Sequence, residues 1–283
     1  MACRAVSPFV QSLVAVTQFR SRANVGAGNE TASGSGRNRA YEWEANMTTL
    51  RIDIWSDVAC PWCYVGKRRF EAALARFAGR DLVEVVWRAF ELDPSAPRIR
   101  DKTTSYAARL ARKYGVPLAR GEAMIHHMTE IAKAEGLDFD FGRVQSGNTF
   151  DAHRLLQLAL VHGRQNALKE RLFRAYFCEG AAIGEPETLM RLAADVDLDR
   201  DRVSATLAGD DYALEVRADE DEARALGING VPFFVLGGRY AVPGAQPVEV
   251  LLQALDRASL AAGPSVDLEG SSVCRSDDCV EHD

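Results

Sequence analysis

Cys60 and Cys63, separated by a proline and a tryptophan, are the residues whose types and spacing point most directly to chemistry. Two thiols three positions apart can form a disulfide and exchange it with another thiol. The same spacing also occurs as half of a zinc site, or by chance. The flanking sequence therefore has to decide between redox chemistry and metal binding.

A strand before this cysteine pair and a helix after it are predicted from periodicity. Before the pair, apolar residues alternate with charged ones as in a half-buried strand, namely Leu50, Ile52 and Ile54. After it, apolar residues recur on one helical face, namely Cys63, Phe70, Leu74 and Phe77. Pro61 suits the first helical position, because its missing N–H would have no partner within the helix. The pattern predicts Cys60 as the N-cap, with Cys63 one turn inside.

This placement predicts different chemistry for the two sulfurs. Cys60 would face the positive end of the helix dipole, which can lower a thiol pKa from about 8.5 to roughly 3.5–7.5. Cys63 would point toward the core and release a mixed disulfide held on Cys60 by attacking it. Because Pro61 and Trp62 carry no charge, we expect the dipole to supply most of the thiolate stabilisation. We therefore expect an intermediate reduction potential.

Composition and charge exclude several classes of function. The chain has 283 residues, 47% of them hydrophobic, and can bury a core in one domain with a large insertion. A net charge of −6 argues against nucleic acid or an anionic membrane as the main partner. No apolar run approaches the roughly 20 residues of a membrane helix. Six cysteines without a convincing export signal indicate a reducing compartment, so we expect a cytoplasmic protein.

Both ends of the chain are expected to be flexible. Residues 1–46 are expected to be a disordered N-terminal extension, rich in glycine and serine after residue 24, in which Cys3 is incidental. Residues 263–283 are expected to be a flexible acidic tail. Its Cys274 and Cys279 could form a small-loop disulfide or exchange with the cysteine pair as an accessory redox relay. They could equally be two unrelated surface thiols, and a zinc site built from all four cysteines is a minor alternative.

The folded part is predicted to be a sheet domain split by helices. Residues 47–101 and 227–262 would form the sheet domain, with a second strand at 82–87, a hairpin over 230–242 and a final helix starting near Pro247. Residues 102–226 are predicted to be a helical insertion, and glycine and proline separate its helices. The predicted helices are 104–114, 120–135, 150–162, 166–180, 186–195, 200–208 and 211–226.

Three histidines and one further cysteine are interpreted as structural and not as functional residues. The stretch Asn148–Leu155 is typical of a cap followed by an amphipathic helix, so His153 on it is more often a packing or surface residue than a substrate contact. His126 and His127 are adjacent, which makes a poor metal pair. Cys178 lies in an apolar helical stretch and is expected to be buried and inert.

The order of these elements resembles the thioredoxin fold as elaborated in the DsbA-like family, with the FrnE-type subgroup the most similar. The matching pieces are Ser56–Cys63, Asn148–Thr149 with Ala152–Leu155, and Gly230–Phe234. The resemblance implies an α/β fold, with a thioredoxin-like mixed sheet and a large all-helical insertion. It also implies a cis Val231–Pro232 peptide against the cysteine pair. An extended substrate could then pair with the Val231 backbone as an added strand, beside Pro61, Trp62 and Pro232.

Three functions are weighed on these residues. The leading one is a disulfide oxidoreductase or isomerase acting on thiol- or disulfide-containing protein substrates, with Cys60 and Cys63 catalytic, no metal or cofactor, and an unidentified recycling partner. The alternative is a glutathione-dependent isomerase or transferase, because the same elaborated fold serves kappa-class glutathione transferases and 2-hydroxychromene-2-carboxylate isomerases. Those relatives carry serine where Cys60 stands and lack the second cysteine. The third is a zinc-binding or chaperone-like module.

Overall fold

The computed structural model describes residues 49–98 and 103–262. The N-terminal extension, Cys3, and the tail with Cys274 and Cys279 lie outside the described residues, so predictions on them are untested. Within the described ranges, none of the helices combines the length and apolar character needed to cross a bilayer.

A mixed four-stranded sheet forms the centre of the fold, as predicted. Strands β1 (Leu50–Ser56), β2 (Val83–Ala89), β3 (Phe233–Leu236) and β4 (Tyr240–Pro243) lie in the order β2-β1-β3-β4. β1 pairs with β2 in parallel and with β3 antiparallel, and β3 pairs with β4 antiparallel. Gly237 and Gly238 make the β3–β4 turn with φ of 58° and 65°, which glycine adopts without steric cost.

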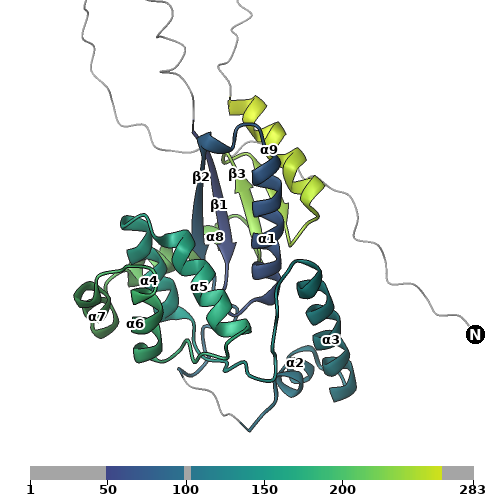
Figure 1. Cartoon of the computed structure of the whole chain (residues 1–283), viewed down its shortest axis with the longest axis vertical. Helices are drawn as coiled ribbons and strands as arrows, with labels where there is room; N and C mark the ends of the chain where they lie inside the picture. The colour runs from purple at the N-terminus through teal and green to yellow at the C-terminus, as the bar shows by residue number, and fades with distance from the viewer. Residues whose placement is uncertain (1–48, 99–102, 263–283) are drawn as a thin grey trace, which may run out of the picture.

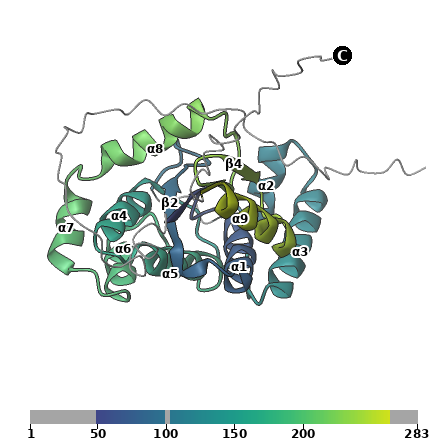
Figure 2. The ribbon, with the colours of Figure 1, turned by 90° about the horizontal axis from the view of Figure 1, so that it is seen from above.

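Helices cover both faces of this sheet, because neighbouring residues of a strand point to opposite sides. Ile54 packs in a core with helices α1 (Pro61–Arg76) and α9 (Val248–Ala262). Trp55, the next residue, packs on the other face against Ala223 of α8 (Ala213–Ala225). In Figure 2, α8 and α1 lie on opposite sides of β2. A short 3-10 helix (Arg80–Leu82) precedes β2.

The insertion between β2 and β3 is entirely helical in its regular elements, as predicted. Its other helices are α2 (Tyr106–Tyr114), α3 (Leu118–Ala134), α4 (Phe150–Val161), α5 (Gln165–Phe177), α6 (Pro186–Ala194) and α7 (Arg200–Ala208). Figure 1 shows α2 and α3 on one side of the lower end of the sheet and α4 to α7 on the other. The predicted helix 166–180 is too long, because α5 ends at Phe177 and Gly180 adopts φ of +69°, where a Cβ would lie 2.6 Å from the Arg143 carbonyl oxygen.

A helix follows Asn148 as predicted, but the prediction that it is amphipathic is wrong. Every residue of α4 from Asp151 to Ala159 is buried, because α4 is enclosed by α5, α6, α7, α8 and β2. Its polar residues are held by internal partners instead of water. Arg154, for example, donates to the carbonyl oxygens of Asp211, Thr206 and Gly209.

The start of α1 is packed into the core of the insertion. Cys60, Cys63 and Tyr64 belong to the same buried cluster as the apolar side chains of α4, α5 and α6. The ring of Tyr64 stacks on that of Phe173, with centroids 4.9 Å apart and planes 12° apart. The sheet domain thus provides the helix that carries the cysteines, and the insertion provides the walls around its first turn.

Candidate active site

A tight turn between β1 and α1 positions Cys60. The Cys60 N–H donates to the Asp57 carbonyl at 3.1 Å, and the Asp57 side chain accepts the N–H groups of Ala59 at 3.2 Å and Leu92 at 2.8 Å. Cys60 is the N-cap and Pro61 is at the start of the helix, as predicted. No side chain among the described residues caps α1, so its positive end is left to the Cys60 sulfur.

The two thiols differ in burial and in pKa. Cys63 has no exposed surface, whereas Cys60 keeps 4% exposed and opens onto a cavity. Burial raises the pKa of Cys63 well above its ordinary value, and its neighbour Cys60 raises it further. Both cysteines are reduced. Cys63 therefore stays a thiol near neutral pH, while Cys60 is the sulfur that can be reached from the cavity.

The start of β3 lies directly against the cysteine pair. The Val231–Pro232 peptide is cis, as the resemblance implied, and the Cys60 Sγ donates to the Val231 carbonyl oxygen at 3.5 Å. Gly66 of α1 permits this approach, since a Cβ there would lie 2.9 Å from the Cγ of Pro232. We did not single out Gly66 from the sequence, although a glycine inside a predicted helix is a signal of close backbone packing.

A cavity of about 920 Å³ lies above Cys60. Trp62, which is 40% exposed, and Val231 lie beside the sulfur at its base, and α2 and α3 form the opposite wall. That wall combines apolar residues with exposed basic ones, namely Leu110, Arg112, Lys113, Met124 and Met128. Three of the four residues predicted to contact substrate, Pro61, Trp62 and Val231, line this cavity, and Pro232 does not.

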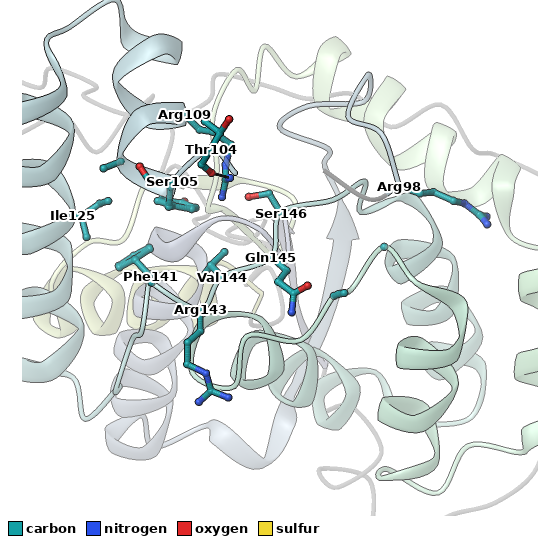
Figure 3. Close-up of a pocket in the computed structure, with 15 residues that line it drawn as sticks. Arg98, Thr104, Ser105, Arg109, Ile125, Phe141, Arg143, Val144, Gln145 and Ser146 are labelled. Carbon is teal, nitrogen blue, oxygen red and sulfur yellow. Dashed lines mark hydrogen bonds between the residues drawn. The ribbon is translucent and has the colours of Figure 1, made fainter. Parts of the chain in front are cut away.

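A second hollow of about 400 Å³ adjoins the first and shares residues with it, including Tyr106, Arg109 and Phe141 (Figure 3). Three arginines line this second hollow, but Figure 3 shows the guanidinium groups of Arg98 and Arg143 pointing away from each other. Arg98 pairs with Asp151 at 2.5 Å. The second hollow therefore lengthens the space beyond Cys60 without gathering its cations into one anion site.

Buried charges lie beneath the cysteine pair. His153 is 1% exposed and its Nε2 lies 3.4 Å from Asp57 Oδ1, so it is a packed residue and not a surface one. Burial by itself would raise the pKa of Asp57, but His153 and the N–H groups of Leu92 and Ala59 hold that pKa below its ordinary value. The carboxylate beside the Cys60 turn is therefore ionised at neutral pH.

Lys169 of α5 is a further buried cation near both cysteines, and we did not predict it from the sequence. Its side chain has no exposed surface, and burial lowers its pKa to about 8 while the charges of Cys63, Asp57 and Cys60 favour its protonated form. A signal was present, because position 169 falls on the stripe of α5 that also carries Gln165, Leu168, Leu172 and Phe173. The expectation that the helix dipole supplies most of the thiolate stabilisation did not include this buried cation.

Asp57 gives a prediction on pH dependence. Its folded pKa lies below the unfolded value of about 3.9, so its contribution to stability is complete above that value and is lost as the pH falls through the folded pKa. We expect the free energy of unfolding to fall less steeply below pH 5 in Asp57→Asn than in the wild type, as measured by urea unfolding. Glu122→Gln, which removes an exposed carboxylate, is the control. Parallel slopes for Asp57→Asn and wild type would contradict the assignment.

Cys178 was predicted to be buried and inert, and the structure shows it only partly buried. Its thiol is free, lies at the edge of the core cluster that also contains Cys63, and does not line the cavity at Cys60. Burial still raises its pKa, so it stays protonated near neutral pH and does not act as a nucleophile. Among the described residues, no three His, Cys, Asp or Glu side chains are grouped to hold a metal ion.

A mixed sheet with a Cys-x-x-Cys pair at a helix N-terminus and a cis proline beside it defines a thioredoxin-like protein of the disulfide-exchanging class. The family comparison agrees with this. Residues 51–256 match the model of the DSBA-like thioredoxin domain, and the chain belongs to that family.

Similar proteins support the same assignment. The crystal structure of a probable DsbA oxidoreductase, SCO1869 from Streptomyces coelicolor, is 44% identical, with a TM-score of 0.72 over 83% of this chain and 100% of that one. The uncharacterized protein YwbO of Bacillus subtilis is 30% identical over 73% of this chain and 96% of its own length. The cytosolic disulfide reductase DsbM from Pseudomonas aeruginosa shares the fold, at 18% identity and a TM-score of 0.50 over 75% and 96% of the two chains. Family and structure together indicate a DsbA-like thiol-disulfide oxidoreductase.

Proposed function

We propose that this protein exchanges disulfides with protein substrates through Cys60 and Cys63. The observation that carries the proposal is the unequal placement of the two sulfurs. Cys60 lies at the uncapped N-terminus of α1 and opens onto the cavity, while Cys63 lies fully buried behind it with a raised pKa. The Cys60 thiolate would attack a substrate disulfide, and one substrate sulfur would leave as a thiol. Cys63 would then attack Cys60 and release the second.

The substrate segment is proposed to be extended. The Val231 backbone lies at the edge of the cavity 3.5 Å from the Cys60 sulfur, where an added strand could pair with it. Trp62 offers a half-exposed aromatic surface beside the attacked bond. The adjoining second hollow provides length for residues further along the segment.

Within the family, we propose the FrnE-type subgroup, a cytoplasmic location, and a thiol or disulfide recycling partner.

Trapping the mixed disulfide tests this function. In Cys63→Ala the resolving thiol is absent. We therefore expect the mixed disulfide that Cys60 forms by attacking an insulin disulfide to persist, and dithiothreitol to release it. Non-reducing electrophoresis and mass spectrometry would identify the linked residue. Cys178→Ala is the matched control, since it removes a thiol outside the site and should accumulate no complex. Absence of any Cys60-linked complex in Cys63→Ala would refute the function.

The glutathione-dependent alternative also has an observation in its favour. The cavity of about 920 Å³ can hold a tripeptide, and exposed Arg112 and Lys113 on its wall would attract carboxylates. A single-cysteine mechanism would not need Cys63. Tight glutathione binding in titration calorimetry, with turnover of a small electrophile surviving Cys63→Ala, would favour this alternative over protein disulfide exchange.

The second cysteine pair remains a prediction. Cys274 and Cys279 are proposed as an accessory relay, and the alternative is two unrelated thiols. If they exchange with the site, the apparent reduction potential of the Cys60–Cys63 couple should differ between the full chain and a Cys274→Ser/Cys279→Ser variant. Equilibration with glutathione buffers measures both potentials, and equal values would favour unrelated thiols.

A further inference from the structure

Lys169 occupies an unusual position for a lysine. It has no exposed surface and no hydrogen-bond partner among the described residues. Its Nζ lies 5.0 Å from the centroid of the Phe173 ring and 5.5 Å from that of Trp87. These two ring faces compensate only part of the cost of burying an ammonium group. Packing alone does not explain a lysine here, because a methionine of similar volume would fill the site without that cost.

The other buried lysine of the site shows the contrast. Lys67 of α1 is 2% exposed but pairs with Glu71 at 2.5 Å and with Glu170 at 2.8 Å. Lys169 has no such carboxylate. Phe173, whose ring centroid lies 5.0 Å from the Lys169 Nζ, stacks on Tyr64, the residue next to Cys63. The acidic groups whose charges reach Lys169 are Cys63, Asp57 and Cys60. The partner of the Lys169 charge is therefore the cysteine pair itself together with Asp57.

We propose that Lys169 is a positioning residue for the resolving step, in which its positive charge stabilises the thiolate that Cys63 forms as it attacks Cys60. This inference rests on the proposed disulfide exchange. It also assigns a role in the chemistry to the insertion, because Lys169 is on α5, outside the sheet domain.

The resolving step conserves atoms and electrons, and Lys169 neither gains nor loses a proton in it. A partner sulfur is bonded to Cys60 as a mixed disulfide. The Cys63 sulfur forms a new bond to Cys60, the bond from Cys60 to the partner breaks, and the partner leaves with the electron pair of that bond. The proton of Cys63 ends on the partner sulfur, which departs as a thiol. The protein is oxidised to its disulfide, the partner is reduced, and Lys169 stays protonated.

The surrounding charges explain why one cation matters at this step. Burial and the neighbouring Cys60 raise the pKa of Cys63, while Lys169 is the side-chain charge that lowers it. Asp57 faces the same space with an opposing charge, and Lys67 repels the ammonium of Lys169 from α1. In a dry interior such charge interactions are weakly screened. Without Lys169, Cys63 would ionise only at higher pH.

The test compares Lys169→Met with the wild type by stopped flow. A peptide disulfide carrying a fluorophore forms the mixed disulfide on Cys60, and its release reports the resolving step. We expect release at pH 7 to slow by about tenfold, as for a rise of one unit in the pKa of Cys63. The pH profile of release should move to higher pH. Because the substitution removes a buried charge that makes no hydrogen bond, thermal stability should be unchanged or higher. A purely structural lysine would lower stability and leave the pH profile in place.

Lys67→Met is the matched control, because it removes a buried lysine that already has carboxylate partners. We expect its release rate to stay within about twofold of the wild type. Equal release rates and pH profiles in Lys169→Met and wild type would overturn the inference, as would equal slowing in both variants. A wild type that forms no mixed disulfide at all would instead refute the proposed function, so the two failures are distinguishable.

Discussion

Replacing Cys60 with serine should abolish disulfide exchange. We expect the rate of insulin reduction by Cys60→Ser to fall by about 1000-fold or more, to the rate without protein. The reason is that a hydroxyl at the N-terminus of α1 remains protonated near neutral pH and cannot form the mixed disulfide. The structure makes this loss specific, because Cys63 is fully buried with a raised pKa and cannot replace Cys60 as the attacking group.

Two controls separate this loss from misfolding. Serine is a preferred N-cap residue, so Cys60→Ser should melt at the same temperature as the wild type or higher. Cys178→Ser changes a thiol that does not line the cavity at Cys60 and should keep full activity. Undiminished insulin reduction by a folded Cys60→Ser would show that the nucleophile has been misassigned.

Replacing Asp219 with alanine should give the largest loss of stability. Asp219 of α8 has a 3% exposed side chain, and it accepts from the Ala89 N–H at 2.9 Å, the Gln157 amide at 2.7 Å and Arg88 at 2.7 Å. These donors come from β2 and α4, so one carboxylate links the sheet to the insertion. Burial raises the pKa of Asp219, which means that burying its charge is itself unfavourable. The loss of stability in Asp219→Ala would therefore come mainly from the N–H donors left without an acceptor.

We expect Asp219→Ala to lower the free energy of unfolding by about 3 kcal/mol. For a folded part of this size, that corresponds to a fall in Tm of roughly 6–12 °C. Urea unfolding followed by circular dichroism would measure it. Asp53→Ala is the control, because Asp53 pairs with the same Arg88 at 2.8 Å from a more exposed position and should cost about 1 kcal/mol or less. A loss below about 1 kcal/mol in Asp219→Ala would contradict the linking role.

The sequence alone predicted the cysteine pair at the start of α1 and the order of the elements. Alternation before Cys60 and helical periodicity after Cys63 are local patterns, because strands and helices repeat over two and 3.6 residues. Pro61 predicted the start of α1 for a local reason too, because the N–H that proline lacks has no partner at the first helical position. The helices of the insertion were predicted within a few residues, since glycine and proline mark their ends.

Only the tertiary structure decided what surrounds the two sulfurs. Asp57, His153 and Lys169 come from the β1–α1 turn, α4 and α5, and their meeting depends on how the insertion packs on the sheet domain. Periodicity could show that position 169 faces inward, but not that it faces Cys63. The reason is physical: backbone pattern is set by neighbours in the chain, whereas burial and the electric field at a thiol also depend on residues distant in the sequence, such as His153 and Lys169.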